Sequence, residues 1–309
     1  MTAKAVLLMG PTASGKTDVA ISLSKRFPCD IISVDSALVY RGMDIGTAKP
    51  DAETLRRAPH QLINIRDPEE SYSAGDFVRD ARLAIACSVA KGRIPLLVGG
   101  TMMYFRALTE GIADLPAADS RIREQIDADA KRLGWPAMHA ELLKVDPALA
   151  ARLSPNDSQR IQRALEVFHI SGKPLSEWQR EAVMEPDGIE YIKIALQIEP
   201  RAVLHQRIEQ RLDSMLRNGF ENEMLALRAR AGLDRNSSSM RSVGYRQFWA
   251  YLDGEYSRQE ATDRALFATR QLAKRQLTWL RSENEVFLVD PLEADAIGTI
   301  SANLARKLG

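Results

Sequence analysis

The stretch Gly10-Pro11-Thr12-Ala13-Ser14-Gly15-Lys16-Thr17 sets the organisation of this chain. It matches the phosphate-loop pattern G-x-x-x-x-G-K-[ST] at every fixed position. Residues 5–9 before it predict a buried strand, and residues 18–27 after it predict a helix with its apolar side chains on one face. A Gly-rich turn that matched by chance would lack this strand–loop–helix order, so we interpret the stretch as a phosphate loop.

The chemistry of such a loop accounts for its residue types. Glycines allow several backbone N–H groups to point into one concavity, where they meet phosphate oxygens. The N-terminus of the following helix adds the positive end of its dipole. Lys16 supplies a mobile cation, and the Thr17 hydroxyl can hold Mg²⁺. The loop therefore predicts a bound phosphate or pyrophosphate, but it does not identify the reaction.

Length and composition indicate the class of protein. With 309 residues and 45% hydrophobic residues, the chain is expected to form a full core, in two domains or in one domain with a large insertion. Its 42 basic and 41 acidic residues nearly cancel, so any surface for nucleic acid must be a local patch. The longest apolar runs have the length of strands, which predicts no membrane span.

The N-terminus and the cysteines bear on localisation. The chain enters its first strand directly, so we expect no cleaved signal peptide. Cys29 and Cys87 form no metal or disulfide pattern, and we expect both to be small buried residues of a reduced protein. We therefore expect a cytoplasmic protein, and we further expect a monomer.

Two other strands end in polar residues that belong near the phosphate loop. Residues 29–34 predict a buried strand that ends at Asp35-Ser36, and residues 95–98 predict another that ends at Gly99-Gly100-Thr101. Ligands of open α/β sheets lie beyond the carboxyl ends of the strands, so Asp35 and Thr101 should face the same crevice. Position leaves two roles open for each: Asp35 could instead form a turn, and Thr101 could be a helix N-cap.

One acidic group that a hydrolytic enzyme needs is missing from this pattern. Such phosphate-loop enzymes usually carry an acid at the end of a strand, where it holds Mg²⁺ through water. The strand at 95–98 ends in glycines, and the acid nearest the site is Asp35. The segment at 37–50 has no clean period and mixes Gly with polar and apolar residues, which is typical of a structured binding loop.

The middle of the chain changes character. Residues 114–187 are helical by pattern, poor in strands and interrupted by prolines, so we expect an inserted helical subdomain. Its clearest helix spans 157–171, with Asn156 or Asp157 as the N-cap. Gln159, Arg160 and Arg163 lie away from the apolar stripe of this helix. By charge pattern alone they are more simply a solvated face.

After the insertion the α/β pattern resumes. Strands are expected at 190–198 and 286–289, in addition to a short one before the insertion at 60–65, and a helix that starts at 199–201 carries Arg207 and Arg211 on one face. Acidic neighbours make a salt-bridged surface the alternative for these two arginines. Residues 240–246 predict a loop with two arginines and a tyrosine. We expect an α/β fold with a P-loop NTPase-like core, its mostly parallel sheet flanked by helices, plus the helical insertion.

A long helix at 258–281 carries a row of cations. Arg270, Lys274 and Arg281 share one stripe, with Arg275 and Trp279 close by. A cationic stripe beside an aromatic side chain can track a phosphate backbone. The same pattern also occurs on solvated helices, so it does not choose between the two.

Taken together and in order, these motifs resemble those of the bacterial tRNA dimethylallyltransferases, the IPP transferase family. The resemblance covers about residues 4 to 290. It is carried by residues 10–17, Asp35-Ser36 with 40–50, 98–101, 157–163, 242–247 and 268–276. Many members have Met-Gln at the positions of Ala37-Leu38.

The resemblance implies a prenyl transfer to RNA. The exocyclic N6 of the adenine 3′ to the anticodon, in tRNAs that read codons beginning with U, attacks the allylic carbon of dimethylallyl diphosphate, and diphosphate leaves. The phosphate loop with Lys16, and Mg²⁺ on Thr17, would hold the diphosphate. Asp35 would orient N6 and take its proton, Thr101 would position the diphosphate or the base, and Arg207 or Arg211 would reach the diphosphate.

The resemblance also implies a surface for the tRNA anticodon stem-loop. The adenine would be flipped out of the loop, while the helical insertion and the basic C-terminal helix hold the RNA by its phosphates. The residues expected to contact tRNA are Asp35, Ser36, Ala37, Leu38, Thr101, Arg123, Gln159, Arg160, Ile161, Gln162, Arg163, Arg241, Ser242, Val243, Gly244, Tyr245, Arg246, Arg270, Lys274, Arg275 and Arg281.

Three other activities use the same phosphate loop. A small-molecule phosphoryl transferase would use Asp35 to activate a hydroxyl and would need no RNA. An RNA-binding NTPase switch would hydrolyse nucleotide and leave the mass of the RNA unchanged. A prenyltransferase for free AMP or ADP would not need the segments that hold tRNA.

Overall fold

The larger part of the chain is an α/β unit built on one parallel sheet. A computed structural model describes residues 2–113, 115–181 and 188–309. The chain divides into two compact units, one formed by residues 1–109 with 186–309 and one by residues 110–185. Six parallel strands of the first unit follow the order β3-β2-β4-β1-β5-β6. The expected α/β fold with a parallel, helix-flanked sheet is confirmed.

The strands of this sheet are short. They are β1 (Ala3–Met9), β2 (Cys29–Val34), β3 (His60–Gln61), β4 (Ile94–Gly99), β5 (Ile189–Leu196) and β6 (Phe287–Val289). The helices of the same unit are α1 (Lys16–Ser24), α2 (Ala52–Arg57), α3 (Ala74–Ala90), α4 (Met102–Glu110), α10 (Arg201–Arg217), α11 (Phe220–Arg228), α12 (Tyr245–Leu252), α13 (Arg258–Leu280) and α14 (Ala296–Leu308). A turn of 3₁₀-helix covers Ser239–Arg241.

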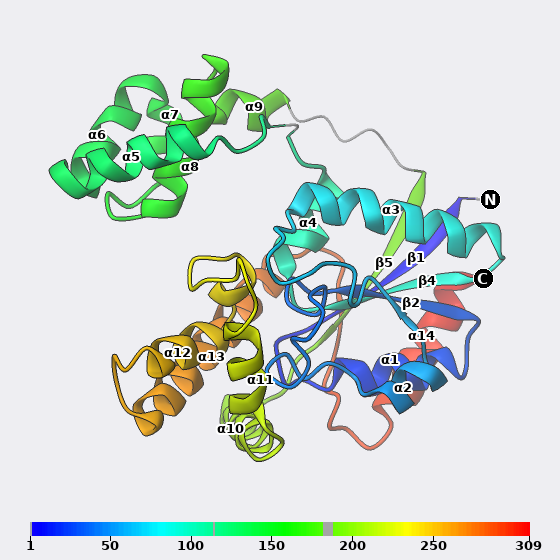
Figure 1. The fold of residues 1–309 in the computed structure, drawn as a ribbon. Coiled ribbons are helices and arrows are strands. Elements are labelled where there is room, and N and C mark those ends of the chain that lie inside the picture. The colour runs from blue at the N-terminus through cyan, green and yellow to red at the C-terminus, as the bar shows by residue number, and fades with distance from the viewer. Residues whose placement is uncertain (1, 114, 182–187) are drawn as a thin grey trace. The chain divides into compact units, whose positions relative to one another are not determined.

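Alternating residues of the central strand serve two cores. Val6 and Leu8 of β1 pack with α1 and α14, whereas Leu7 and Met9 pack on the opposite side with α3, α4 and the C-terminal helices. Figure 1 shows α3 and α4 on one side of the sheet and α1 and α14 on the other. A strand buried on both faces has to be apolar at successive positions, which is what the run at 5–9 contains.

The second unit is entirely helical in its described residues and has its own core. Its helices are α5 (Ser120–Leu133), α6 (Trp135–Val145), α7 (Pro147–Ala150), α8 (Ser158–Ser171) and α9 (Leu175–Glu181). Ile126, Leu142, Ile161 and Leu165 are buried together in it. Asp157 is the N-cap of α8 and accepts from the Arg160 N–H. Both boundaries that we expected for this insertion, residues 114 and 187, lie outside the described residues.

The structure differs from the sequence-based expectations at three places. β3 stops after two residues because Leu62 and Asn64 have φ values of +62° and +57°, which a strand cannot accommodate. The segment at 240–246 is not a loop throughout, because α12 already begins at Tyr245. The Gln247 side chain caps this helix by accepting the Gly244 N–H. Cys87 is exposed, so the expectation that both cysteines are buried holds only for Cys29.

Among the described residues, no helix combines the length and the apolar character that crossing a bilayer requires.

Candidate active site

The expected catalytic residues meet in one cavity of the α/β unit. The cavity has a volume of about 780 Å³ and lies where the strands end at their carboxyl side. Lys16, Asp35 and Thr101 all line it. Its remaining walls come from the segment at 46–50, from α10, from residues 241–245 and from α13.

The phosphate loop has the backbone that its sequence predicts. Gly15 has a φ of +86° and stands at the N-cap of α1, so Lys16 and Thr17 form the first turn of that helix. Lys16 Nζ donates to the Gly10 carbonyl at 3.0 Å and to the Pro11 carbonyl at 2.6 Å. Burial lowers the pKa of Lys16 to about 7; the Arg211 charge contributes, and Asp35 opposes the shift.

Two arginines of α10 approach the phosphate loop. Arg207 Nε donates to the Ala13 carbonyl at 2.8 Å, and Arg211 Nη2 donates to the Thr47 carbonyl at 2.9 Å. Both side chains line the cavity. Burial lowers the pKa of Arg211, and the Asp35 charge opposes this shift. The structure thus brings both predicted arginines to the cavity, beside Lys16 and Asp35.

Asp35 and Thr101 both accept hydrogen bonds from backbone N–H groups that follow β2. Asp35 Oδ1 accepts the Ala37 N–H at 2.8 Å and the Leu38 N–H at 3.2 Å, which is the turn-forming role that the sequence left open. Asp35 Oδ2 takes part in no hydrogen bond with the described residues. Thr101 Oγ1 accepts the Ser36 N–H at 3.1 Å and so joins the ends of β4 and β2. Its hydroxyl hydrogen remains a donor for a ligand.

Gln276 of α13 is a residue to which the sequence analysis assigned no role. Its Oε1 accepts the Thr12 N–H of the phosphate loop at 2.9 Å, and its Nε2 donates to the Gly100 carbonyl at 2.8 Å. A Cβ on Gly100 would lie 2.4 Å from Gln276 Nε2, so a side chain there would displace the Gln276 amide from these hydrogen bonds. The signal that could have identified Gln276 is a polar residue on the apolar side of α13, next to Ala273 and Leu280.

Most of the expected tRNA contacts of the α/β unit that precede α13 line the cavity. Ser36, Ala37 and Leu38 line the cavity, as do Arg241, Ser242, Val243, Gly244 and Tyr245. Tyr245 is fully buried, and its hydroxyl donates to Glu223 at 2.6 Å. Arg246 is exposed outside the lining.

The cations of α13 do not form one continuous surface. Arg275 lines the cavity, whereas Arg270 and Lys274 line a separate, small groove against α10. Arg270 forms an ion pair of 3.2 Å with Glu209. Arg281 is exposed at the end of the helix. The stripe that helical spacing predicts is therefore divided, with Arg270 already paired.

Within the helical unit, several expected RNA contacts have protein partners. Arg123 and Arg163 both donate to Glu166, which is fully buried, at 2.8 Å and 2.7 Å. Burial raises the pKa of Glu166, but these hydrogen bonds outweigh it and lower the pKa. Ile161, also expected to contact tRNA, is fully buried in the core, so its side chain offers no surface to RNA.

The remaining expected RNA contacts on α8 face outward or bond within the helical unit. Gln162 donates to Asp127 at 2.7 Å, and Arg160 pairs with its own N-cap, Asp157, at 3.3 Å. Gln159 is exposed.

The donor groups of the cavity suit a magnesium ion that arrives with a phosphate ligand. Mg²⁺ is usually held by one or two protein groups together with substrate phosphates and water. Thr17 lines the cavity beside the phosphate loop and offers a hydroxyl oxygen. The described residues contain no cluster of three His, Cys, Asp or Glu side chains that could hold a metal by themselves. The residues fit a substrate-borne Mg²⁺.

Comparisons with known proteins identify the family of this chain. The model of the family described as IPP transferase matches residues 38–283, and the isopentenyl transferase model matches residues 3–70, which include the phosphate loop. A tRNA dimethylallyltransferase of Thiobacillus denitrificans is 54% identical over 99% of this chain and 97% of its own length. This chain belongs to the IPP transferase family.

Solved structures of this family have the same fold. The tRNA isopentenylpyrophosphate transferase of Bacillus halodurans is 38% identical and covers 99% of this chain and 96% of its own, with a TM-score of 0.72. A eukaryotic dimethylallyltransferase acting on tRNA is 25% identical, and the match covers 99% of this chain and 79% of that one, with a TM-score of 0.80. The IPP transferase match extends over α10 and α13, so the residues that close the cavity belong to the family region.

The buried Lys16 predicts a pH dependence for anion binding. Because the pKa of Lys16 is about 7, its side chain is largely a neutral amine above that pH. It must then take up a proton from solvent when a diphosphate binds beside it. We expect the affinity for inorganic pyrophosphate to fall by up to tenfold per pH unit above pH 7, with proton uptake on binding. Isothermal titration calorimetry from pH 6 to 9, in buffers of different ionisation enthalpy, measures both.

Lys16→Arg is the matched control for this pH dependence. A guanidinium stays protonated over this range, so the variant reports only the titration of pyrophosphate itself. The same pH slope in both proteins would contradict the assignment.

Proposed function

We propose that this protein transfers a dimethylallyl group from dimethylallyl diphosphate to N6 of the adenine 3′ to the anticodon, in tRNAs that read codons beginning with U. The observation that carries the proposal is the convergence in one cavity of a phosphate loop, the cations Lys16 and Arg211, and the carboxylate of Asp35. Family membership with relatives named for this reaction supports the choice of substrates.

The cations and backbone of the cavity suit the leaving group. The phosphate-loop N–H groups, Lys16 and the α10 arginines Arg207 and Arg211 would surround the diphosphate. As the allylic C–O bond breaks, negative charge grows on the departing oxygen, and these groups stabilise it most in the transition state. When bound at Thr17, Mg²⁺ would supply further neutralisation of the diphosphate charge.

Asp35 suits the attacking nucleophile. The N6 amine is a weak nucleophile because its lone pair is delocalised into the adenine ring. A hydrogen bond from N6 to Asp35 would orient the amine, and the carboxylate would take the N6 proton as the new C–N bond forms. The products are the N6-dimethylallyl adenosine and diphosphate. A stacked adenine cannot bring N6 to a carbon inside the cavity, so the base would leave the anticodon-loop stack.

The test is a reaction of the purified protein with dimethylallyl diphosphate, Mg²⁺ and unmodified tRNA. We expect the RNA to gain the mass of one dimethylallyl group, located at the adenosine next to the anticodon. ATP should compete with the prenyl donor without being cleaved over many turnovers. An unchanged RNA mass together with tRNA-stimulated phosphate release from ATP would instead identify an NTPase, and modification of free AMP would identify a different acceptor.

Asp35→Asn is predicted to lower the rate of prenyl transfer. The amide oxygen can still accept the Ala37 and Leu38 N–H groups, so the turn is retained while the base is lost. We expect single-turnover rates to fall by about 10² to 10⁴, with the affinity for pyrophosphate nearly unchanged. Wild-type rates across the pH range would remove Asp35 from the role of base.

The exposed cations of α13 are predicted to contact tRNA phosphates. Substitution of Lys274, Arg275 or Arg281 by Ala should each lower the slope of log K against log salt by about one unit. Arg270→Ala should have a smaller effect, because Glu209 already pairs with that guanidinium.

Arg264→Ala removes one cation from the same helix and is the control, since Arg264 is paired with Glu260 at 2.8 Å. If every variant kept the wild-type slope of log K against log salt, these cations would be solvated side chains without RNA contacts.

A further inference from the structure

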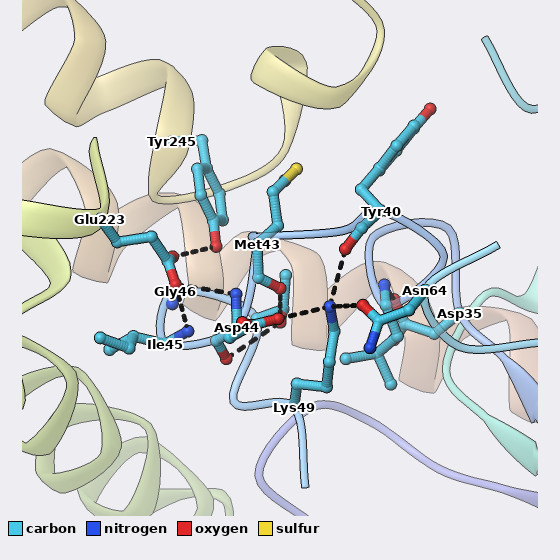
Figure 2. Close-up of polar contacts among 12 residues, drawn as sticks. Asp35, Tyr40, Met43, Asp44, Ile45, Gly46, Lys49, Asn64, Glu223 and Tyr245 are labelled. Atoms are coloured by element: carbon cyan, nitrogen blue, oxygen red, sulfur yellow. Dashed lines mark hydrogen bonds and ion pairs between the residues drawn. The ribbon is translucent and has the colours of Figure 1, made fainter. Parts of the chain in front are cut away.

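A single carboxylate anchors the loop that follows Tyr40. Glu223, on α11, accepts the backbone N–H groups of Asp44 and Ile45 through Oε2, at 2.8 Å and 2.6 Å, and that of Gly46 through Oε1 at 3.0 Å. The Tyr245 hydroxyl donates to the same Oε1 at 2.6 Å. Figure 2 shows these donors gathered around Glu223 from the loop and from α12.

Three successive backbone N–H groups form a small anion-binding concavity. In this protein the anion is part of the chain itself, so this concavity is not a second phosphate site. A Cβ on Gly46 would lie 2.2 Å from Phe220 and 2.7 Å from Tyr245, which leaves no room for a side chain at this position. The loop is therefore pressed against α11 and α12 as well as hydrogen-bonded to Glu223.

Lys49 fixes the other end of the same loop. Its side chain is 3% exposed, and Nζ donates to the Tyr40 carbonyl at 2.7 Å and to Asp44 Oδ1 and Asn64 Oδ1 at 2.6 Å each. Thr47 lies between the two anchored ends. The loop has no strand or helix of its own, and these two charged side chains hold it together with its internal hydrogen bonds, among them the Thr47 hydroxyl donating to the Met43 carbonyl at 2.7 Å.

The anchored segment faces the cavity. Gly46, Thr47, Ala48 and Pro50 line it, and the Thr47 carbonyl accepts Arg211 Nη2 at 2.9 Å. Arg211 is a long, flexible side chain that gains directionality only when an acceptor holds one edge of its guanidinium. The contacts thus run from Glu223 through the loop backbone to Arg211 and the diphosphate side of the cavity.

We propose that Glu223 is a positioning residue for diphosphate binding: by holding the N–H groups of residues 44–46 it fixes the Thr47 carbonyl, and through it the direction in which Arg211 presents its guanidinium. This role rests on the proposed function, in which a diphosphate occupies the cavity. Glu223 touches no substrate and acts only through Arg211.

Glu223→Gln is the variant that tests the role. The amide keeps one oxygen acceptor but turns an NH₂ group toward backbone N–H donors, so the loop can no longer be held as it is. We expect the affinity for inorganic pyrophosphate, measured without tRNA, to fall about tenfold. In the transfer assay kcat/KM for dimethylallyl diphosphate should fall at least as much, because Arg211 also stabilises the leaving group, while the KM for tRNA should change less than about threefold.

A double-mutant cycle separates positioning from a general loss of structure. If Glu223 acts through Arg211, Glu223→Gln should weaken pyrophosphate binding less than about twofold in an Arg211→Ala background. Multiplicative losses would overturn the proposal. Glu221→Gln, which breaks a surface ion pair between the same helix and Arg258, is the control and should leave binding within about twofold of wild type.

Tyr245→Phe covers the case in which Glu223→Gln fails to fold. It removes one of the four donors to Glu223 and should weaken pyrophosphate binding in the same direction, again only when Arg211 is present. No change in pyrophosphate binding would overturn the proposal. Because pyrophosphate binding needs no RNA and no transfer, a failure of this proposal is distinct from a failure to prenylate tRNA.

Discussion

The parallel pairing of β1 with its neighbours is the constraint on which the site depends. In the sheet Met9 pairs with both Gly99 of β4 and Ala195 of β5, and Gly99 in turn pairs with Val34 of β2. Because these strands run parallel and end at the same level, the residues that follow them leave the sheet at one edge. The phosphate loop, Asp35 and Gly100 with Thr101 are therefore neighbours although the chain separates them widely.

The charged side chains at this edge of the sheet suit the binding of an anionic ligand better than they stabilise the fold. Burial and Arg211 lower the pKa of Lys16 to about 7, with Asp35 as the opposing carboxylate. Two neighbouring cations in a low-dielectric cavity repel each other, and the diphosphate of the proposed reaction would relieve that repulsion on binding. Burying these charges costs free energy of folding, and the two hydrophobic cores on the faces of the sheet offset that cost.

Carboxylates outside the cavity organise donor groups in each of the two units. Glu166 holds Arg123 and Arg163 in the helical unit, and Glu223 holds the loop at 44–46 in the α/β unit. In each case an acid gathers several donors, so cations or backbone dipoles keep one orientation. Several residues that a motif associates with RNA are thus first of all parts of the protein's own hydrogen-bond network, and Ile161 is part of its core.

The sequence by itself determined the local features, namely the phosphate loop, the buried strands, the capped helix at α8 and the α/β class, because these depend on short-range patterns of glycines, caps and apolar residues. Only the tertiary structure decided which polar residues meet. Gln276 bonds to Thr12, and Glu223 to Asp44, across separations that no periodicity reports. Helical spacing likewise placed Arg270, Lys274 and Arg281 on one stripe, but packing against α10 paired Arg270 with Glu209 and turned Arg275 toward the cavity. A charged side chain's partner is chosen by what packs beside it, and that is known only once the chain has folded.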